Sequence, residues 1–108
     1  MIVALSISPS GSPRAGSDPE PDGGVSEAVA AAVQVIRDSG LPHELNAMFT
    51  NIEGEWDEVM AVVKQAVDVV AERYPRVGVV IKADVRAGYD GQLAAKVERV
   101  EQRLAGDA

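Results

Sequence analysis

The sequence predicts a single α+β domain, in which two helices cover one face of a four-stranded antiparallel sheet and a third helix follows. Segments rich in β-branched residues alternate with segments whose apolar residues recur at helical spacing. The clearest strand pattern lies late in the chain, where it would complete the sheet. With 108 residues, the chain is long enough for one modest core. We therefore expect residues 1–108 to form one domain.

The first part of the chain contains a strand, a loop and a helix. Ile2 to Ser8 has the composition of a strand. Residues 9–24 are rich in proline and glycine and have almost no apolar anchor, so they are predicted to form a flexible loop. Val25 to Ser39 is predicted to be helical, because its apolar residues fall on one stripe. Gly40 and Pro42 end this helix.

The rest of the chain supplies three strands and two helices. His43 to Phe49 and Asn51 to Gly54 are predicted strands, and Glu55 to Tyr74 is a long helix. Arg76 to Ala87 alternates strictly, and Leu93 to Leu104 marks a third helix. The core stripe of the long helix is predicted to be Trp56, Val59, Met60, Val63, Val67, Val70 and Tyr74. A second apolar line, Val62, Ala66 and Val69, indicates either helix curvature under the third helix or a subunit contact.

The resulting order β-α-β-β-α-β-α is that of a ferredoxin-like sandwich with an extra C-terminal helix. One face of such a sheet has no helix of its own, so a partner subunit, a ligand or the third helix must cover it. Alternation assigns Lys82, Asp84 and Arg86 to this open face. Other residues assigned to it are Ser6, Ser8, Glu44, Asn46 and Met48. The residues assigned to the core face are Val3, Leu5, Ile7, Leu45, Ala47, Phe49, Val77, Val79, Ile81, Ala83 and Val85.

Composition narrows the classes of function. The net charge is −7 and no basic face with aromatic residues is visible, so we expect neither nucleic acid nor an anionic membrane as a partner. A cationic small ligand is compatible with this charge. The absence of cysteine fits a cytoplasmic protein, and no apolar run is long enough to span a membrane. Because only four aromatic residues are present, the core should be thin, and oligomerisation would stabilise it.

Catalytic templates fit the sequence poorly. His43 is the only histidine, and no G-x-S-x-G elbow surrounds any serine. The loop "PSGSPRAG" lacks the ending of a phosphate-binding loop, and no metal-ligand spacing is present. We therefore expect no catalytic residues, no metal, no cofactor and no enzymatic activity.

The corner "TNIEG" is a candidate for one wall of a binding site. It places the hydroxyl of Thr50 and the carboxylate of Glu53 beside Gly54, which would let a ligand approach the backbone closely. A carboxylate can pair with a cationic ligand, and an aromatic ring such as that of Phe49 or Trp56 can stack on the cation. The alternative is that Thr50 and Glu53 only satisfy the turn and the helix start.

Four segments together resemble the small thiamine-binding protein family, also known as the YkoF-like group. These are "SGLPHEL", "MFTNIEGEWDEVMAVVKQA", "RVGVVIKADVR" and "KVERVEQRL". The resemblance covers Ile2 to Leu104, and its most specific pieces are Thr50 to Gly54 and Ile81 to Arg86. The segment "GGVSEAV" resembles the serine-containing helix start of the family.

The resemblance implies a ferredoxin-like protein that assembles through its sheets into a homo-oligomer, a dimer or a tetramer. Some members bind thiamine or its hydroxymethylpyrimidine part, and no catalytic activity is implied. The implied ligand-binding positions are Ser26, Thr50, Glu53, Lys82 and Arg86.

The sequence departs from the family pattern at Phe49, where the family tends to have glycine, and at Ala47, where it tends to have proline. The ring of Phe49 could stack on a pyrimidine or close the pocket, so Phe49 joins the candidate site.

The sequence thus predicts non-enzymatic binding of thiamine or hydroxymethylpyrimidine by a small cytosolic homo-oligomer. A regulatory or interaction module, whose open sheet face serves only assembly, is the alternative. A third possibility is an enzyme of unknown reaction, since a fold does not fix a function.

Overall fold

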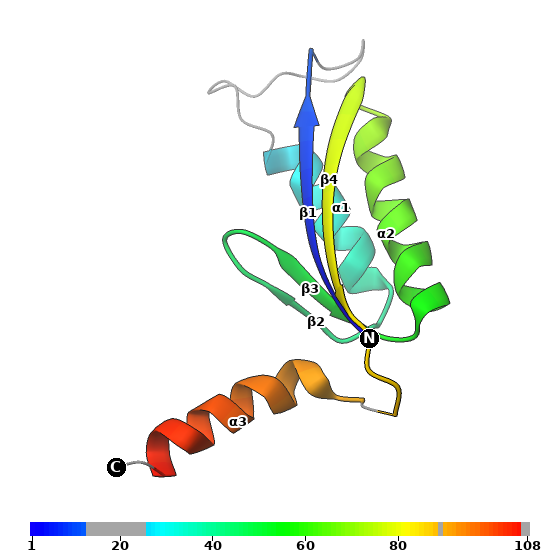
Figure 1. Ribbon diagram of the computed structural model, residues 1–108. Coiled ribbons are helices and arrows are strands. Elements are labelled where there is room, and N and C mark those ends of the chain that lie inside the picture. Colours follow the sequence, from blue (N-terminus) through cyan, green and yellow to red (C-terminus); the bar gives the residue numbers. More distant parts are fainter. Residues whose placement is uncertain (13–25, 89, 107–108) are drawn as a thin grey trace.

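The computed structural model describes residues 1–12, 26–88 and 90–106 (Figure 1). The predicted loop 9–24 lies largely outside these residues, and its first two residues belong to the first strand. The elements, in chain order, are β1 (Ile2–Ser10), α1 (Ser26–Asp38), β2 (His43–Leu45), β3 (Thr50–Glu53), α2 (Trp56–Ala71), β4 (Arg76–Asp84) and α3 (Gln92–Gly106).

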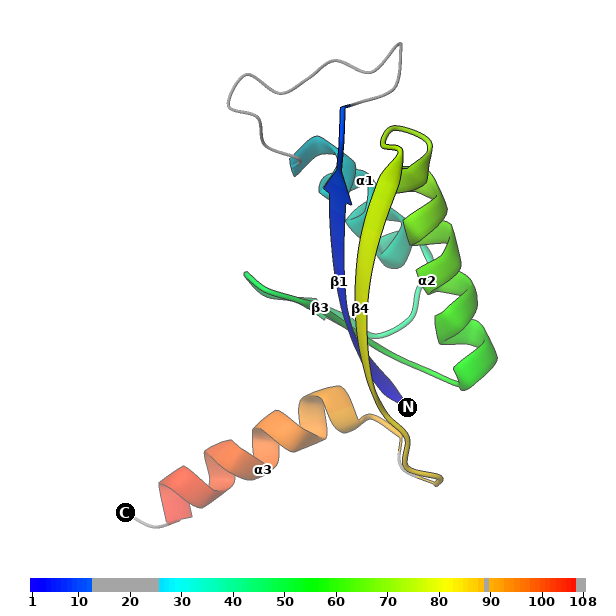
Figure 2. The same cartoon turned by 45° about the horizontal axis from the view of Figure 1, so that its top comes forward.

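The four strands form one antiparallel sheet with the order β2-β3-β1-β4. α1 and α2 lie side by side on one face of this sheet (Figures 1 and 2). α3 begins near the end of β4, close to the N-terminus, and projects away from the two other helices (Figure 1). The predicted α+β class, the ferredoxin-like order of elements and the extra C-terminal helix are confirmed.

The core lies between the sheet and the pair of helices. β1 and β3 contribute side chains from alternate positions, because successive residues of a strand point to opposite faces. The buried hydrophobic residues are Val3, Leu5, Ala28, Ala32, Ile36, Ile52, Val59, Val62, Val63, Ala66, Val70 and Tyr74. This core is thin and aliphatic, with one tyrosine as its only aromatic member among the described residues.

The buried stripe of α2 is rotated from the predicted one. Val62 and Ala66 are buried in the core of this chain, so neither explanation offered for them, helix curvature or a subunit contact, is correct. Trp56 was predicted to be buried and is 56% exposed. The buried stripe is centred near Val59 and Ala66, which leaves Trp56 and Met60 at its border.

The second predicted strand ends early, at Leu45. The side-chain Oδ1 of Asn46 accepts hydrogen bonds from the N–H groups of Met48 and Phe49, both at 2.9 Å. This turn closes the β2–β3 hairpin, since Asn commonly bonds to backbone two or three residues on. Leu45 and Ala47, predicted to face the core, are exposed because β2 is a short edge strand and Ala47 lies in the turn. Phe49 is half-buried.

The apolar face of β4 meets the helices less completely than predicted. Val77 packs against the core, but Val79 and Ile81 are 37% and 41% exposed. β4 is the outermost strand on its side of the sheet, so only one neighbouring strand shields it. The strand ends at Asp84, three residues before the predicted end, and Val85 is exposed beyond it.

Candidate functional site

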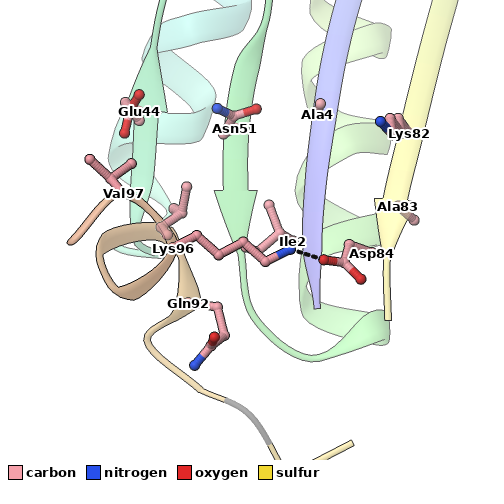
Figure 3. A pocket seen from close by; sticks show the side chains of 11 residues that line it. Ile2, Ala4, Glu44, Asn51, Lys82, Ala83, Asp84, Gln92, Lys96 and Val97 are labelled. Carbon is pink, nitrogen blue, oxygen red and sulfur yellow. Dashed lines mark hydrogen bonds and ion pairs between the residues drawn. The ribbon is translucent and has the colours of Figure 1, made fainter. Parts of the chain in front are cut away.

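A groove lies where the open face of the sheet meets the first turns of α3. Its volume is about 560 Å³, within the range of small-molecule sites. It is lined by Ile2, Ala4, Glu44, Asn51, Lys82, Ala83, Asp84, Gln92, Leu93, Lys96 and Val97. Sheet residues form the floor and α3 forms one wall (Figure 3).

One row of side chains crosses the floor from strand to strand. Ala4 pairs with Asn51 on one side and with Lys82 on the other, and Asn51 pairs with Glu44. The row therefore runs carboxylate, amide, methyl, ammonium across β2, β3, β1 and β4, as Figure 3 shows. The small side chain of Ala4 leaves room above the centre of the row.

The next row of the open face anchors α3. Ile2 pairs with Glu53 on β3 and with Asp84 on β4. Both carboxylates contact α3, Glu53 through backbone N–H groups and Asp84 through a lysine. The position of α3, and with it one wall of the groove, thus depends on two acidic residues of the sheet.

Glu53 caps the N-terminus of α3. Gly91 precedes the helix and has no side chain that could accept a hydrogen bond from the first turn. The Glu53 carboxylate takes this role, accepting the N–H of Gln92 at 2.7 Å and the N–H of Leu93 at 3.3 Å. Glu53 is only 5% exposed, and the partial positive charge of the helix N-terminus favours its negative charge.

Asp84 and Lys96 form an ion pair between β4 and α3 (Figure 3). The hydrogen bond and charge of Lys96 lower the pKa of the Asp84 carboxyl below its ordinary value of 3.8, with smaller contributions from Arg86 and the N-terminal amine. The side chain of Lys96 crosses over Ile2 to reach Asp84 and so bounds the groove on that side (Figure 3).

We expect the Lys96→Met variant to titrate Asp84 at a higher pH than the wild type. A carboxyl whose pKa is lowered by folding stabilises the fold above its unfolded pKa, about 3.9, and that contribution is lost as the pH falls through the folded value. The Asp84–Lys96 contribution should therefore vanish below the ordinary aspartate range. NMR titration of side-chain carboxyl shifts would measure the pKa of Asp84 in both proteins.

The matched control for this titration is Lys64→Met. It breaks an exposed ion pair with Asp68 on α2, at 2.9 Å, and should leave the Asp84 pKa unchanged. Equal Asp84 pKa values in the wild type and Lys96→Met would show that the ion pair does not form in solution.

The structure brings three of the six sequence-predicted site residues together. Lys82 lines the groove, and Glu53 and Arg86 line a narrow space beside it, next to Lys96. Ser26 begins α1, which covers the opposite face of the sheet.

Two further candidates, Phe49 and Thr50, do not line the groove. Thr50 is buried on the helix-covered face, where it borders a small space beside Leu5 and Ile36. Thr50 and Glu53 therefore lie on opposite faces of the sheet and do not form one wall.

Gly54 has a packing role at this corner. A Cβ at residue 54 would lie 3.1 Å from Cγ2 of Val59 and 3.4 Å from Cδ2 of Leu41. The glycine therefore lets β3 and α2 approach closely. At the start of α2, the backbone N–H of Glu55 donates to Oε1 of Glu58 at 3.1 Å, so a residue other than Glu53 serves that helix.

Several groove residues were not among the predicted site residues. Glu44 and Asp84 were assigned to the open face by alternation, and the same pattern applied to the third strand would have added Asn51. Gln92, Leu93, Lys96 and Val97 belong to α3, and no local signal showed where this helix lies.

The described residues form neither a metal-binding cluster nor a membrane-spanning helix. Within residues 1–12, 26–88 and 90–106, no group of three or more His, Cys, Asp or Glu side chains could hold a metal ion. In the same part of the chain, no helix has the length and apolar character needed to cross a bilayer.

The fold and the groove define a small ferredoxin-like domain with a ligand-sized site between its open sheet face and its C-terminal helix. The sequence model of the family described as thiamine-binding protein matches residues 3–101. The chain therefore belongs to the thiamine-binding protein family, and the resemblance in the sequence is confirmed.

Similar proteins include relatives by sequence and by structure. UPF0045 protein Mb1933 of Mycobacterium bovis is 48% identical over 105 residues, covering 96% of this chain and 94% of the relative. The crystal structure of MJ1052 from Methanocaldococcus jannascii has a TM-score of 0.74 at 28% identity, covering 94% of this chain and 95% of that one.

A third similar protein is TM0486 of Thermotoga maritima, provisionally assigned to thiamine biosynthesis or salvage. It has a TM-score of 0.73 and covers 92% of this chain and 96% of its own. At 23% identity, this likeness shows the fold alone.

Proposed function

We propose that this protein binds thiamine or its hydroxymethylpyrimidine part in the groove under α3, without transforming it, as a cytosolic homo-oligomer. The observation that carries the proposal is the groove itself, which combines a polar floor with an apolar and charged wall in a member of a thiamine-binding family. Its volume suits a ligand of two small rings.

The groove offers matching chemistry for each part of this ligand. The amide of Asn51 can both donate to and accept from the aminopyrimidine edge, and the carboxylate of Glu44 can accept from its amino group. The apolar side chains of Ile2, Leu93 and Val97 can contact the ring faces.

In this proposal, Lys82 keeps the ligand-binding role that was expected of it, and the other sequence-predicted residues do not. Lys82 contacts the ligand directly, and Glu53 acts by holding α3 in place. Arg86 lies beside the groove. Phe49 and Thr50 receive no ligand contact within one subunit, and Ser26 begins α1 on the other face of the sheet.

Calorimetric titration of the purified, folded protein with thiamine and hydroxymethylpyrimidine tests the proposal. We expect saturable binding with one site per chain or per subunit pair. Light scattering after size-exclusion chromatography would give the subunit number of the same sample. Flat titrations with ligand-free, folded protein would rule out the proposed function.

One observation favours a second candidate, an interaction module that uses these surfaces only for assembly. Three apolar side chains of α3 that recur at helical spacing, Val97, Val100 and Leu104, are each more than half exposed. Flat titrations from a stable oligomer would support this alternative.

A further inference from the structure

The row across the groove floor separates opposite charges at its two ends. This inference rests on the proposed function and concerns the chemical form of the ligand. The row begins with Glu44 on β2 and ends with Lys82 on β4, the two outer strands of the sheet. Because neighbouring strands are about 4.8 Å apart, the backbones at the two ends are about 14 Å apart.

The charges at both ends are available to a ligand. Within the described part of the chain, neither the carboxylate of Glu44 nor the ammonium of Lys82 has a hydrogen bond or an ion pair. The other ammonium of the groove, on Lys96, is paired with Asp84 and is therefore already neutralised. Lys82 is thus the one lysine of the groove lining whose charge is not met by a described carboxylate.

The groove does not share the strongly negative charge of the whole chain. Its lining carries two carboxylates, Glu44 and Asp84, and two ammonium groups, Lys82 and Lys96, so the local formal charge is zero. An anionic group can therefore enter at the Lys82 end, although the chain as a whole has a net charge of −7.

We propose that the groove prefers a phosphate monoester of thiamine to the free alcohol. In thiamine, the amino group of the pyrimidine and the hydroxyethyl group of the thiazolium lie at opposite ends of a two-ring scaffold. With the aminopyrimidine at Glu44 and Asn51 and the rings above Ala4, the hydroxyethyl end points toward Lys82. A phosphate at that end gives Lys82 a charge-assisted hydrogen bond that the alcohol cannot match.

Calorimetry with thiamine and thiamine monophosphate on the full chain tests this preference. We expect the wild type to bind the monophosphate at least about tenfold more tightly than it binds thiamine. Lys82→Gln should lower the affinity for the monophosphate about tenfold, much more than that for thiamine, and so remove the preference. Lys82→Arg, which keeps the positive charge, should retain the preference for the monophosphate. Circular dichroism would confirm that each variant is folded.

Lys64→Gln on α2 is the matched control, because it makes the same change of charge on an exposed lysine away from the groove. It should keep the preference for the monophosphate. Inorganic phosphate should not compete with the monophosphate at equal concentration, since it lacks the ring contacts.

Each other outcome overturns a defined part of the inference. Equal or tighter binding of free thiamine by the wild type overturns the preference and leaves the proposed function intact. A preference that survives in Lys82→Gln overturns the placement of the phosphate. Effective competition by inorganic phosphate identifies an adventitious anion site and overturns the inference. If neither thiamine compound binds, the proposed function and this inference both fail.

Discussion

Replacing Ile52 with alanine is expected to destabilise the fold by about 2–5 kcal/mol. Ile52 lies at the centre of β3, has no exposed surface and packs in the core between the sheet and the two helices. Truncation to alanine removes buried methyl and methylene groups and leaves a cavity that the neighbouring β1 backbone cannot fill. A domain of this size has a free energy of unfolding of only about 5–15 kcal/mol, so the loss is a large fraction of the total.

Chemical denaturation followed by circular dichroism would measure the change, at one fixed protein concentration because an oligomer is expected. Ile81→Ala is the matched control. It is the same substitution on the same face of the sheet, but Ile81 lies on the outer strand and is 41% exposed. A loss of stability in Ile81→Ala as large as that in Ile52→Ala would mean that β4 is buried in solution, for example by a second subunit.

The sequence predicted the parts of the fold that depend on local periodicity. Strict alternation in β4 placed Lys82 and Asp84 on the open face, where the structure has them. Alternation in β1 placed Val3 and Leu5 in the core, and both are buried. In α2 the apolar residues form a face that is wider than one stripe. Periodicity alone therefore did not show which part of that face is buried.

The prediction that Thr50 and Glu53 form one wall of a site was wrong, and the strand periodicity of the sequence contains the reason. Residues three apart on one strand point to opposite faces, because the side-chain period of a strand is two. Both residues belong to β3, so the hydroxyl of Thr50 faces the helices and the carboxylate of Glu53 faces the groove side. The prediction began the third strand at Asn51 and treated Thr50 to Gly54 as a strand-to-helix corner at which both groups could converge.

The position of α3 could not be predicted from the sequence. Local capping leaves a signal next to a helix, but Gly91 provides no side-chain cap and the acceptor comes from Glu53, about forty residues earlier in the chain. The ion pair of Lys96 with Asp84 also joins separate elements. One wall of the groove therefore depends on contacts that only the folded chain reveals.

Replacing Glu53 with alanine should release α3 without unfolding the domain. The change removes the only side-chain acceptor that the described structure shows for the N–H groups of Gln92 and Leu93, a charge-assisted contact of about 1–3 kcal/mol. α3 has no buried residues of its own, so apart from this cap and the exposed Asp84–Lys96 ion pair little holds it to the sheet. The core residues do not depend on this contact, and the main unfolding transition should change little.

Hydrogen exchange followed by mass spectrometry would separate the two effects. We expect the amides of residues 92–106 to exchange faster in Glu53→Ala, while those of β1 and α2 keep their protection. The affinity for thiamine should fall about tenfold, because the groove loses one wall when α3 moves. The exchange rate of α3 and the affinity for thiamine in Glu53→Gln should lie between those of the wild type and those of Glu53→Ala. The glutamine amide keeps one acceptor oxygen but has no charge.

Glu98→Ala is the control for this experiment, because it removes an equal charge from α3 itself at an exposed position outside the groove lining. It should leave both the exchange of α3 and the affinity unchanged. If Glu53→Ala binds thiamine like the wild type while α3 exchanges faster, the helix is not part of the binding site, and the ligand must use the sheet alone. If neither quantity changes, α3 is held in solution by contacts other than the Glu53 cap, of which an interface with a second subunit along Val97, Val100 and Leu104 is the first to examine.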